Sequence, residues 1–180
     1  MRKVIYALVA PTGGGKSTLI QEMLRAFPND LAVVISTTTR PKRPGPEDDI
    51  FYRFVSDAEF EARVAAEHFV QHVRYGGNRY GTDRRDIESV FAAGRCGINA
   101  FVEPAVWNVR RAGYEVVAIR IVPSGPYRGR DEARAKDDAA RANLGFVPEL
   151  EIQNSFEPGG LETSVDVLSS FIGGHLDGLR

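Results

Sequence analysis

A glycine-rich turn follows the first apolar run of the chain and reads Ala10-Pro11-Thr12-Gly13-Gly14-Gly15-Lys16-Ser17-Thr18. The apolar run, residues 4–9, predicts a buried strand, and the residues after the turn have the pattern of a helix. Between a strand and a helix start, such a turn lets successive backbone N–H groups converge on a phosphate. The spacing therefore predicts a phosphate-binding loop, in which Lys16 reaches the terminal phosphates and the Ser17 hydroxyl binds Mg²⁺. Ala10 is a departure, because this motif has its first glycine there.

The composition is typical of one globular domain. The chain has 180 residues, a hydrophobic share of 43% and a formal net charge of −1. That length can bury a substantial core, and the near-zero charge argues against a nucleic-acid coat, so we expect no nucleic-acid or membrane partner. The single cysteine, Cys96, excludes an intrachain disulfide framework and fits a reducing compartment. The first strand is too short for a signal-peptide core or a membrane span, so we expect a cytoplasmic protein.

Apolar runs recur along the chain and alternate with helical patterns. They begin near Val4, Leu31, Cys96, Val116 and Glu151. Runs without polar alternation are typical of parallel sheets covered on both faces, so the pattern predicts a doubly wound α/β fold. Residues 36–46 differ, since they hold three of the ten prolines and three cations. We predict a loop here, either a solvated linker or an anion-binding arm, and not a central strand.

Three motifs together resemble the guanylate kinase family, and the first of them lies in residues 36–46. They are Ser36-Thr37-Thr38-Thr39-Arg40-Pro41-Lys42-Arg43-Pro44-Gly45, Tyr52-Arg53-Phe54-Val55-Ser56 and Gly77-Asn78-Arg79-Tyr80-Gly81-Thr82. With the phosphate-binding loop, the resemblance extends from about residue 4 to residue 82. It implies a single P-loop α/β domain over residues 1–180. Its parts would be a core (1–35, 83–124 and 146–180), a small β-rich arm for a nucleoside monophosphate (36–82) and a helical lid (about 125–145).

The resemblance also implies an activity. The chain would transfer a phosphoryl group from ATP to a purine (deoxy)nucleoside monophosphate, most readily GMP or dGMP, with Mg²⁺ as the cofactor. These nucleotides would be its small-molecule partners, and the chain would be a monomer or a homodimer. ATP would contact Thr12, Gly13, Gly14, Gly15, Lys16, Ser17, Thr18 and, near its adenine, Asn154.

The acceptor nucleotide would lie in the arm. By resemblance, its 5′-phosphate would contact Arg40, Arg43, Tyr52 and Tyr80, and its base would contact Ser36, Gln71 and Thr82. Guanidinium forks suit a dianionic phosphate because they form bidentate, charge-assisted hydrogen bonds.

The base-recognition position departs from the family. Gln71 stands where the family has a glutamate, whose carboxylate accepts hydrogen bonds from the N1–H and 2-amino groups of guanine. An amide offers one acceptor and one donor group, so Gln71 could pair with guanine or with a 6-aminopurine. The sequence therefore leaves the identity of the base open.

A second departure lies in the run that begins at Cys96. The family has two aspartates one residue apart there, which serve the Mg²⁺ hydration shell and the guanine amino group. Ungapped alignment places Ala100 and Val102 at these positions, and a one-residue slip places Asn99 and Phe101. The nearest acid is Glu103, which could replace them or be a surface charge.

The C-terminal third holds the expected lid and a closing helix. By resemblance, Arg130 or Arg128, together with Arg141, would clamp the transferring phosphoryl group, although a charge-rich helix can also be a solvated face. Residues 161–172 predict an amphipathic helix, and the tail from Gly173 onward is predicted to fray.

Two other classes of function stay open. A kinase for a different acceptor, either a 6-amino or diaminopurine monophosphate or a ribose bisphosphate, would fit the departures. Retention of Ser36, Tyr80 and Thr82 favours a nucleotide over a sugar. A non-catalytic guanylate-kinase-like binding module is disfavoured, because such domains typically lose the loop glycines and the lysine that this chain keeps.

Overall fold

A five-stranded parallel sheet forms the centre of the computed structural model, which describes residues 3–45, 47–124, 132–141 and 144–179. The strand order is β2-β7-β1-β8-β9. The strands are β1 (Val4–Val9), β2 (Leu31–Val33), β7 (Cys96–Phe101), β8 (Glu115–Ser124) and β9 (Leu150–Ser155). The prediction of a doubly wound parallel sheet is confirmed.

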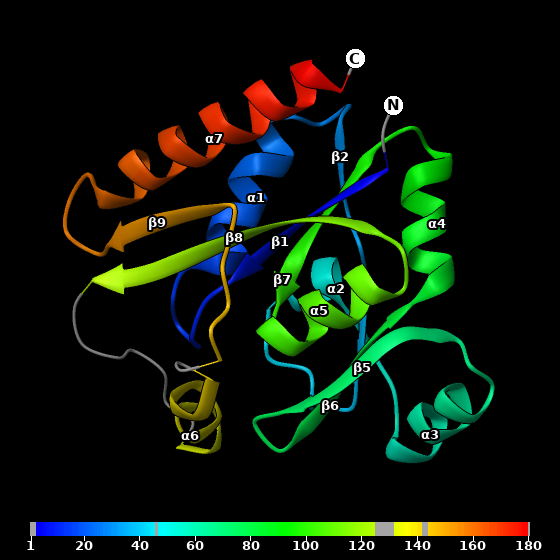
Figure 1. Ribbon diagram of the computed structural model, residues 1–180. Helices are drawn as coiled ribbons and strands as arrows, with labels where there is room; N and C mark the ends of the chain where they lie inside the picture. The colour runs from blue at the N-terminus through cyan, green and yellow to red at the C-terminus, as the bar shows by residue number, and fades with distance from the viewer. Residues whose placement is uncertain (1–2, 46, 125–131, 142–143, 180) are drawn as a thin grey trace.

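Helices cover both faces of this sheet, because side chains alternate along the buried strand β1 (Figure 1). Val4, Tyr6 and Leu8 pack on one side with α1 (Lys16–Ala26) and α7 (Gly160–Gly178). The intervening β1 residues pack on the other side with α4 (Arg84–Ala92) and α5 (Glu103–Arg111). The loop that follows β1 is therefore mounted on a strand buried from both faces.

A second sheet carries the arm and has the order β4-β3-β6-β5. Its strands are β3 (Ser36–Thr38), β4 (Tyr52–Phe54), β5 (Phe69–Tyr75) and β6 (Asn78–Asp83), and helices α2 (Glu47–Phe51) and α3 (Asp57–Ala65) lie beside them. The prediction that residues 36–46 are a loop is wrong for the first three. All the prolines of the segment come after Thr38, so β3 pairs with β4 on one side and β6 on the other.

The end of α7 also differs from the prediction. The helix continues through Gly173 to Gly178, with Leu176 only 2% exposed and the Tyr6 hydroxyl 2.8 Å from His175 Nδ1. Each helix glycine costs roughly 0.5–1 kcal/mol. Burying a leucine side chain contributes about 1.5–3 kcal/mol, which offsets that cost. Among the helices in the described ranges, none has both the length and the apolar character that crossing a membrane requires.

The last helix to place is α6 (Glu132–Arg141), between β8 and β9 in the chain. It lies away from the core sheet, near the tip of the β5–β6 hairpin (Figure 1). The lid residues Arg128 and Arg130 lie outside the described residues.

Candidate functional site

A pocket of about 440 Å³ opens beyond the carboxyl ends of β1 and β7. The loop 10–18 forms one wall, and side chains of the arm form the opposite wall. Ligands of open α/β sheets bind at this edge, beside the strand where the chain switches from one half of the sheet to the other. The position of the pocket thus follows from the strand order.

The backbone of the glycine-rich loop is fixed from behind. Gly13 and Gly15 have φ angles of 79° and 88°, a left-handed conformation that favours glycine. Asn154 donates its amide to Gly14 O at 3.1 Å and accepts a hydrogen bond from Ser164 Oγ at 2.9 Å. It is only 2% exposed, and a side chain on Gly15 would collide with its Nδ2. The Asn154 amide therefore supports the loop, and the expected contact with adenine stays a prediction.

Lys16 lies at the centre of the loop wall. Its Nζ donates to Ala10 O at 2.6 Å and to Pro11 O at 3.0 Å, and its side chain lines the pocket with Ser17 and Thr18. Burial lowers the pKa of the Lys16 ammonium to about 8. The Asp138 carboxylate opposes that shift. The hydrogen bonds of Nζ are to carbonyl oxygens, which carry no net charge, so the ammonium can bind an anion in the pocket.

The two arginines expected at the acceptor phosphate have different surroundings. Arg43 lines the pocket, and its backbone N–H donates to Asp48 Oδ2 at 2.8 Å. Arg40 is 6% exposed, and its guanidinium donates to Asp48 Oδ1 and Pro41 O, both at 2.9 Å. Burial of Asp48 would raise the pKa of its carboxyl, but these hydrogen bonds outweigh that effect and lower it. As placed here, Arg40 holds the arm together, whereas Arg43 faces the ligand space.

The opposite end of the pocket is built to recognise a polar group. Gln71 is 6% exposed, lines the pocket and donates from Nε2 to Thr82 Oγ1 at 2.8 Å. Its Oε1 is buried and has no hydrogen-bond partner among the described residues. Ser36 Oγ accepts from Asn99 Nδ2 at 3.1 Å. A buried amide oxygen without a partner is costly, and a ligand N–H would remove that cost.

The expected loss of carboxylates at the end of β7 is visible in the pocket wall. Ala100, Phe101 and Val102 line it, and Glu103 begins α5. No cluster of three or more acidic, histidine or cysteine side chains that could hold a metal ion occurs within the described ranges. Magnesium at nucleotide sites is held mainly by phosphate oxygens and waters, with only one or two protein groups. The Ser17 hydroxyl in the pocket wall fits a magnesium ion that arrives with a nucleotide.

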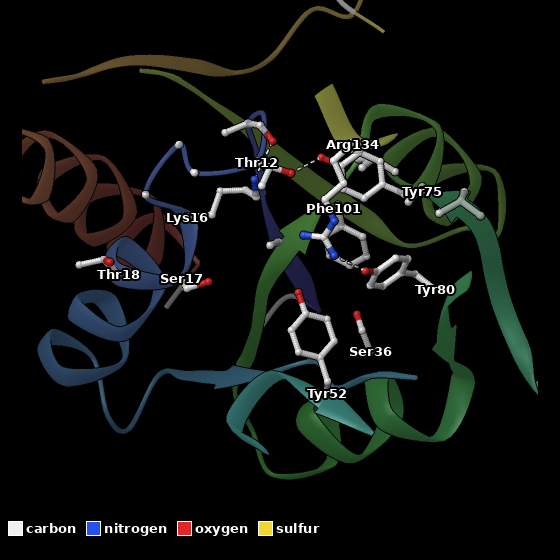
Figure 2. A pocket seen from close by; sticks show the side chains of 18 of the residues that line it. Thr12, Lys16, Ser17, Thr18, Ser36, Tyr52, Tyr75, Tyr80, Phe101 and Arg134 are labelled. Atoms are coloured by element: carbon white, nitrogen blue, oxygen red, sulfur yellow. Dashed lines mark hydrogen bonds between the residues drawn. The ribbon is translucent and has the colours of Figure 1, made fainter. Parts of the chain in front are cut away.

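The lid helix brings an arginine into the pocket that the sequence reasoning missed. Arg134 lines the pocket and donates from Nη2 to the Tyr80 hydroxyl at 2.8 Å. Tyr52 and Tyr80, both expected at the acceptor phosphate, line the same wall (Figure 2). Arg141, the expected clamp, instead donates to Arg74 O at 3.0 Å and lies over the Tyr75 ring. A seven-residue spacing on one helix face could have indicated Arg134 beside Arg141.

Sequence comparisons match this chain to guanylate kinases. The guanylate kinase family model matches residues 1–144. The guanylate kinase of Methylococcus capsulatus is 38% identical over 120 residues, which cover 67% of this chain and 58% of that protein. That of Idiomarina loihiensis is 38% identical over 120 residues (66% and 57%), and that of Chromohalobacter salexigens is 35% identical over 138 residues (76% and 64%). The chain thus spans less than two thirds of the length of these curated relatives.

The fold is also that of a solved relative. The crystal structure of guanylate kinase from Anaplasma phagocytophilum superposes with a TM-score of 0.75 at 24% identity, covering 97% of this chain and 86% of that one. This likeness extends over the closing helix α7, beyond the part that the family model matches. The chain belongs to the guanylate kinase family.

Proposed function

We propose that this chain transfers the terminal phosphoryl group of ATP to the 5′-phosphate of GMP or dGMP. The observation that carries the proposal is one pocket with two different ends. A lysine-bearing phosphate loop forms one end, and Gln71 forms the other, with a buried acceptor oxygen that lacks a partner in the part of the chain that the structure describes. The relatives named guanylate kinase support the same assignment.

At the donor end, the loop contributes backbone N–H groups, the Lys16 ammonium and the start of α1. The positive end of that helix favours the same phosphates. Magnesium, when bound, would neutralise charge on the phosphate oxygens, and Ser17 would hold it. Phosphoryl transfer needs positioning and neutralisation of developing charge more than it needs a general base. The cations around the pocket are therefore the groups on which the rate should depend.

At the acceptor end, the hydrogen bond from Gln71 to Thr82 bears on the choice of base. Guanine presents two neighbouring donors, N1–H and the 2-amino group, to an acceptor. Adenine presents a donor and an acceptor, so it would need both Gln71 Oε1 and an N–H of Nε2. The bond to Thr82 uses one of the two N–H groups of Nε2, so it does not exclude adenine. We favour guanine because it offers two donors to Oε1, which has no partner among the described residues. The comparisons lend no support to an acceptor other than GMP, or to a non-catalytic binding module.

A coupled assay of ADP release tests the proposal. The purified chain with ATP and Mg²⁺ would be given GMP, dGMP, AMP, dAMP or 2,6-diaminopurine riboside monophosphate in parallel. We expect turnover with GMP and dGMP to exceed that with AMP by about 100-fold or more, because a site with buried partners discriminates strongly against mismatched groups. Turnover with AMP equal to that with GMP would contradict the guanine assignment, and no turnover with any acceptor would contradict the kinase assignment.

A further inference from the structure

Asn99 connects the core sheet to the first strand of the arm. It lies in β7 and is only 1% exposed. Its Oδ1 accepts a hydrogen bond from the backbone N–H of Ala100 at 2.7 Å, and its Nδ2 donates to the Val34 carbonyl oxygen and, at 3.1 Å, to Ser36 Oγ. A backbone carbonyl can only accept and a backbone N–H can only donate, so these partners determine which end of the amide carries the nitrogen.

The same bonds determine how the Ser36 hydroxyl can be used. An amide nitrogen has two N–H groups, and Asn99 gives one to Val34 and the other to Ser36. Asn99 therefore takes one of the two acceptor sites of Ser36 Oγ and leaves the hydroxyl proton unused. No acceptor among the described residues receives that proton. A carboxylate at position 99 would have the opposite effect, because it would accept the proton itself.

The Ser36 hydroxyl lies in the pocket, in one row with the other base-recognition side chain. Ser36 lines the cavity and is 7% exposed. Figure 2 shows its hydroxyl turned into the cavity between Tyr52 and Tyr80. In the arm sheet, Thr82 pairs with Ser36 on one side and with Gln71 on the other. Cross-strand partners point to the same face of a sheet, so Ser36 and Gln71 approach a ligand from the same side.

We propose that Asn99 is a positioning residue that makes the site select a purine with an oxygen at carbon 6. This inference rests on the proposed function and concerns the choice of acceptor nucleotide. The Ser36 proton would bond the 6-oxygen, while Gln71 Oε1 would accept from the N1–H and 2-amino groups. A 6-amino group could still bond the remaining lone pair of Ser36 Oγ, but the hydroxyl proton would then have no acceptor in a nearly buried site. A buried donor without a partner is costly, so the amide at position 99 disfavours 6-aminopurines.

The kinetic test measures kcat/KM for three acceptors in the ADP-release assay. GMP is compared with 6-thio-GMP, whose sulfur is a weak acceptor at carbon 6, and with IMP, which lacks only the 2-amino group. Asn99→Asp removes both donors, so it should reduce the preference for GMP over 6-thio-GMP by about fivefold or more and leave the preference for GMP over IMP unchanged. A purely structural defect would lower all three values together. Asn29→Asp is the matched control, because it makes the same change in an exposed turn and should alter neither preference.

A double-mutant cycle shows whether Asn99 acts through Ser36. Ser36→Ala should reduce the preference for GMP over 6-thio-GMP by a similar factor, and adding Asn99→Asp should reduce it no further. An unchanged preference in Asn99→Asp, or additive effects of the two substitutions, would overturn the role of Asn99 and leave the proposed function intact. A wild type that phosphorylates no purine monophosphate would instead overturn the proposed function. If Asn99→Asp does not fold, Asn99→Ala removes the donors without adding a charge, and a wild-type preference in that variant would overturn the proposal.

Discussion

The two walls of the pocket are constructed in different ways. The loop wall presents mainly backbone groups, mounted on the buried strand β1 and supported from behind by the Asn154 amide. The arm wall presents side chains from a separate four-stranded sheet, completed by Arg134 from α6. A backbone wall is insensitive to most substitutions, whereas a wall of side chains can change specificity one residue at a time. We therefore expect Lys16 to control the rate, and the arm residues to control which acceptor is used.

The largest effect should come from the loop wall. Lys16→Ala should reduce kcat by about 100-fold or more, since removing one group that stabilises transition-state charge typically costs about 3–4 kcal/mol. The melting temperature should not fall, because the hydrogen bonds of Nζ to described residues are to carbonyls of its own loop. Turnover and circular dichroism melts measure the two quantities. A well-folded variant with undiminished turnover would mean that Lys16 does not contact the reacting phosphates.

The next effect divides the two arginines of the arm. Arg43→Ala should raise KM for GMP by about tenfold or more with little change in KM for ATP, because a hydrogen bond to a charged group contributes about 1.5–3 kcal/mol. Arg40→Ala should instead lower the free energy of unfolding by roughly 2 kcal/mol or more, since it leaves the Asp48 carboxylate without its main cation. Kinetics and urea unfolding on both variants test this division. If both variants showed the same increase in KM for GMP and neither lost stability, Arg40 would be a ligand of the acceptor phosphate, contrary to this prediction.

A smaller effect concerns base recognition. Gln71→Glu should raise kcat/KM for GMP about tenfold, equivalent to about 1.4 kcal/mol, because the carboxylate offers a second acceptor to guanine. The Thr82 hydroxyl can then donate to it, so the contact between the two side chains is kept with its direction reversed. Activity with AMP should not rise. A variant unchanged on both nucleotides would show that Gln71 does not touch the base.

The smallest effect is a proton linkage at Lys16. Because burial lowers its pKa to about 8 and bound phosphates favour the charged form, ATP binding should take up a fraction of a proton at pH 8 to 9. ATP affinity should therefore weaken as the pH rises above about 8. The free energy of unfolding should rise through the same range, because the unfolded chain, with an ordinary lysine, binds more protons there. Calorimetry in buffers with different ionisation enthalpies measures the number of protons taken up when ATP binds. A value of zero at pH 8 to 9 would contradict the lowered pKa of Lys16.

How far the sequence predicts the site depends on the same difference between the walls. The loop residues and the doubly wound sheet follow from patterns within a few residues, and the structure has the predicted sheet. The arm side chains were predicted from the resemblance to the family. That resemblance does not predict that Arg40 is bonded to Asp48, whereas Arg43 faces the pocket. The positions of Arg134 and Asp138 depend on how α6 docks on the β5–β6 hairpin. This is a long-range contact that no local sequence pattern encodes. The extended end of α7 was missed because burial of Leu176 outweighs the glycines before it.

One measurement tests the central claim most directly: transfer of labelled phosphate between nucleotides. ATP labelled with ³²P at its γ-phosphate would be incubated with the chain, Mg²⁺ and either GMP or AMP, and the products separated by chromatography. The two-walled pocket predicts label in GDP within the time of a few turnovers, very little label in ADP when AMP is the acceptor, and loss of transfer with Lys16→Ala. Label found only in inorganic phosphate, or equally in ADP and GDP, would contradict the account.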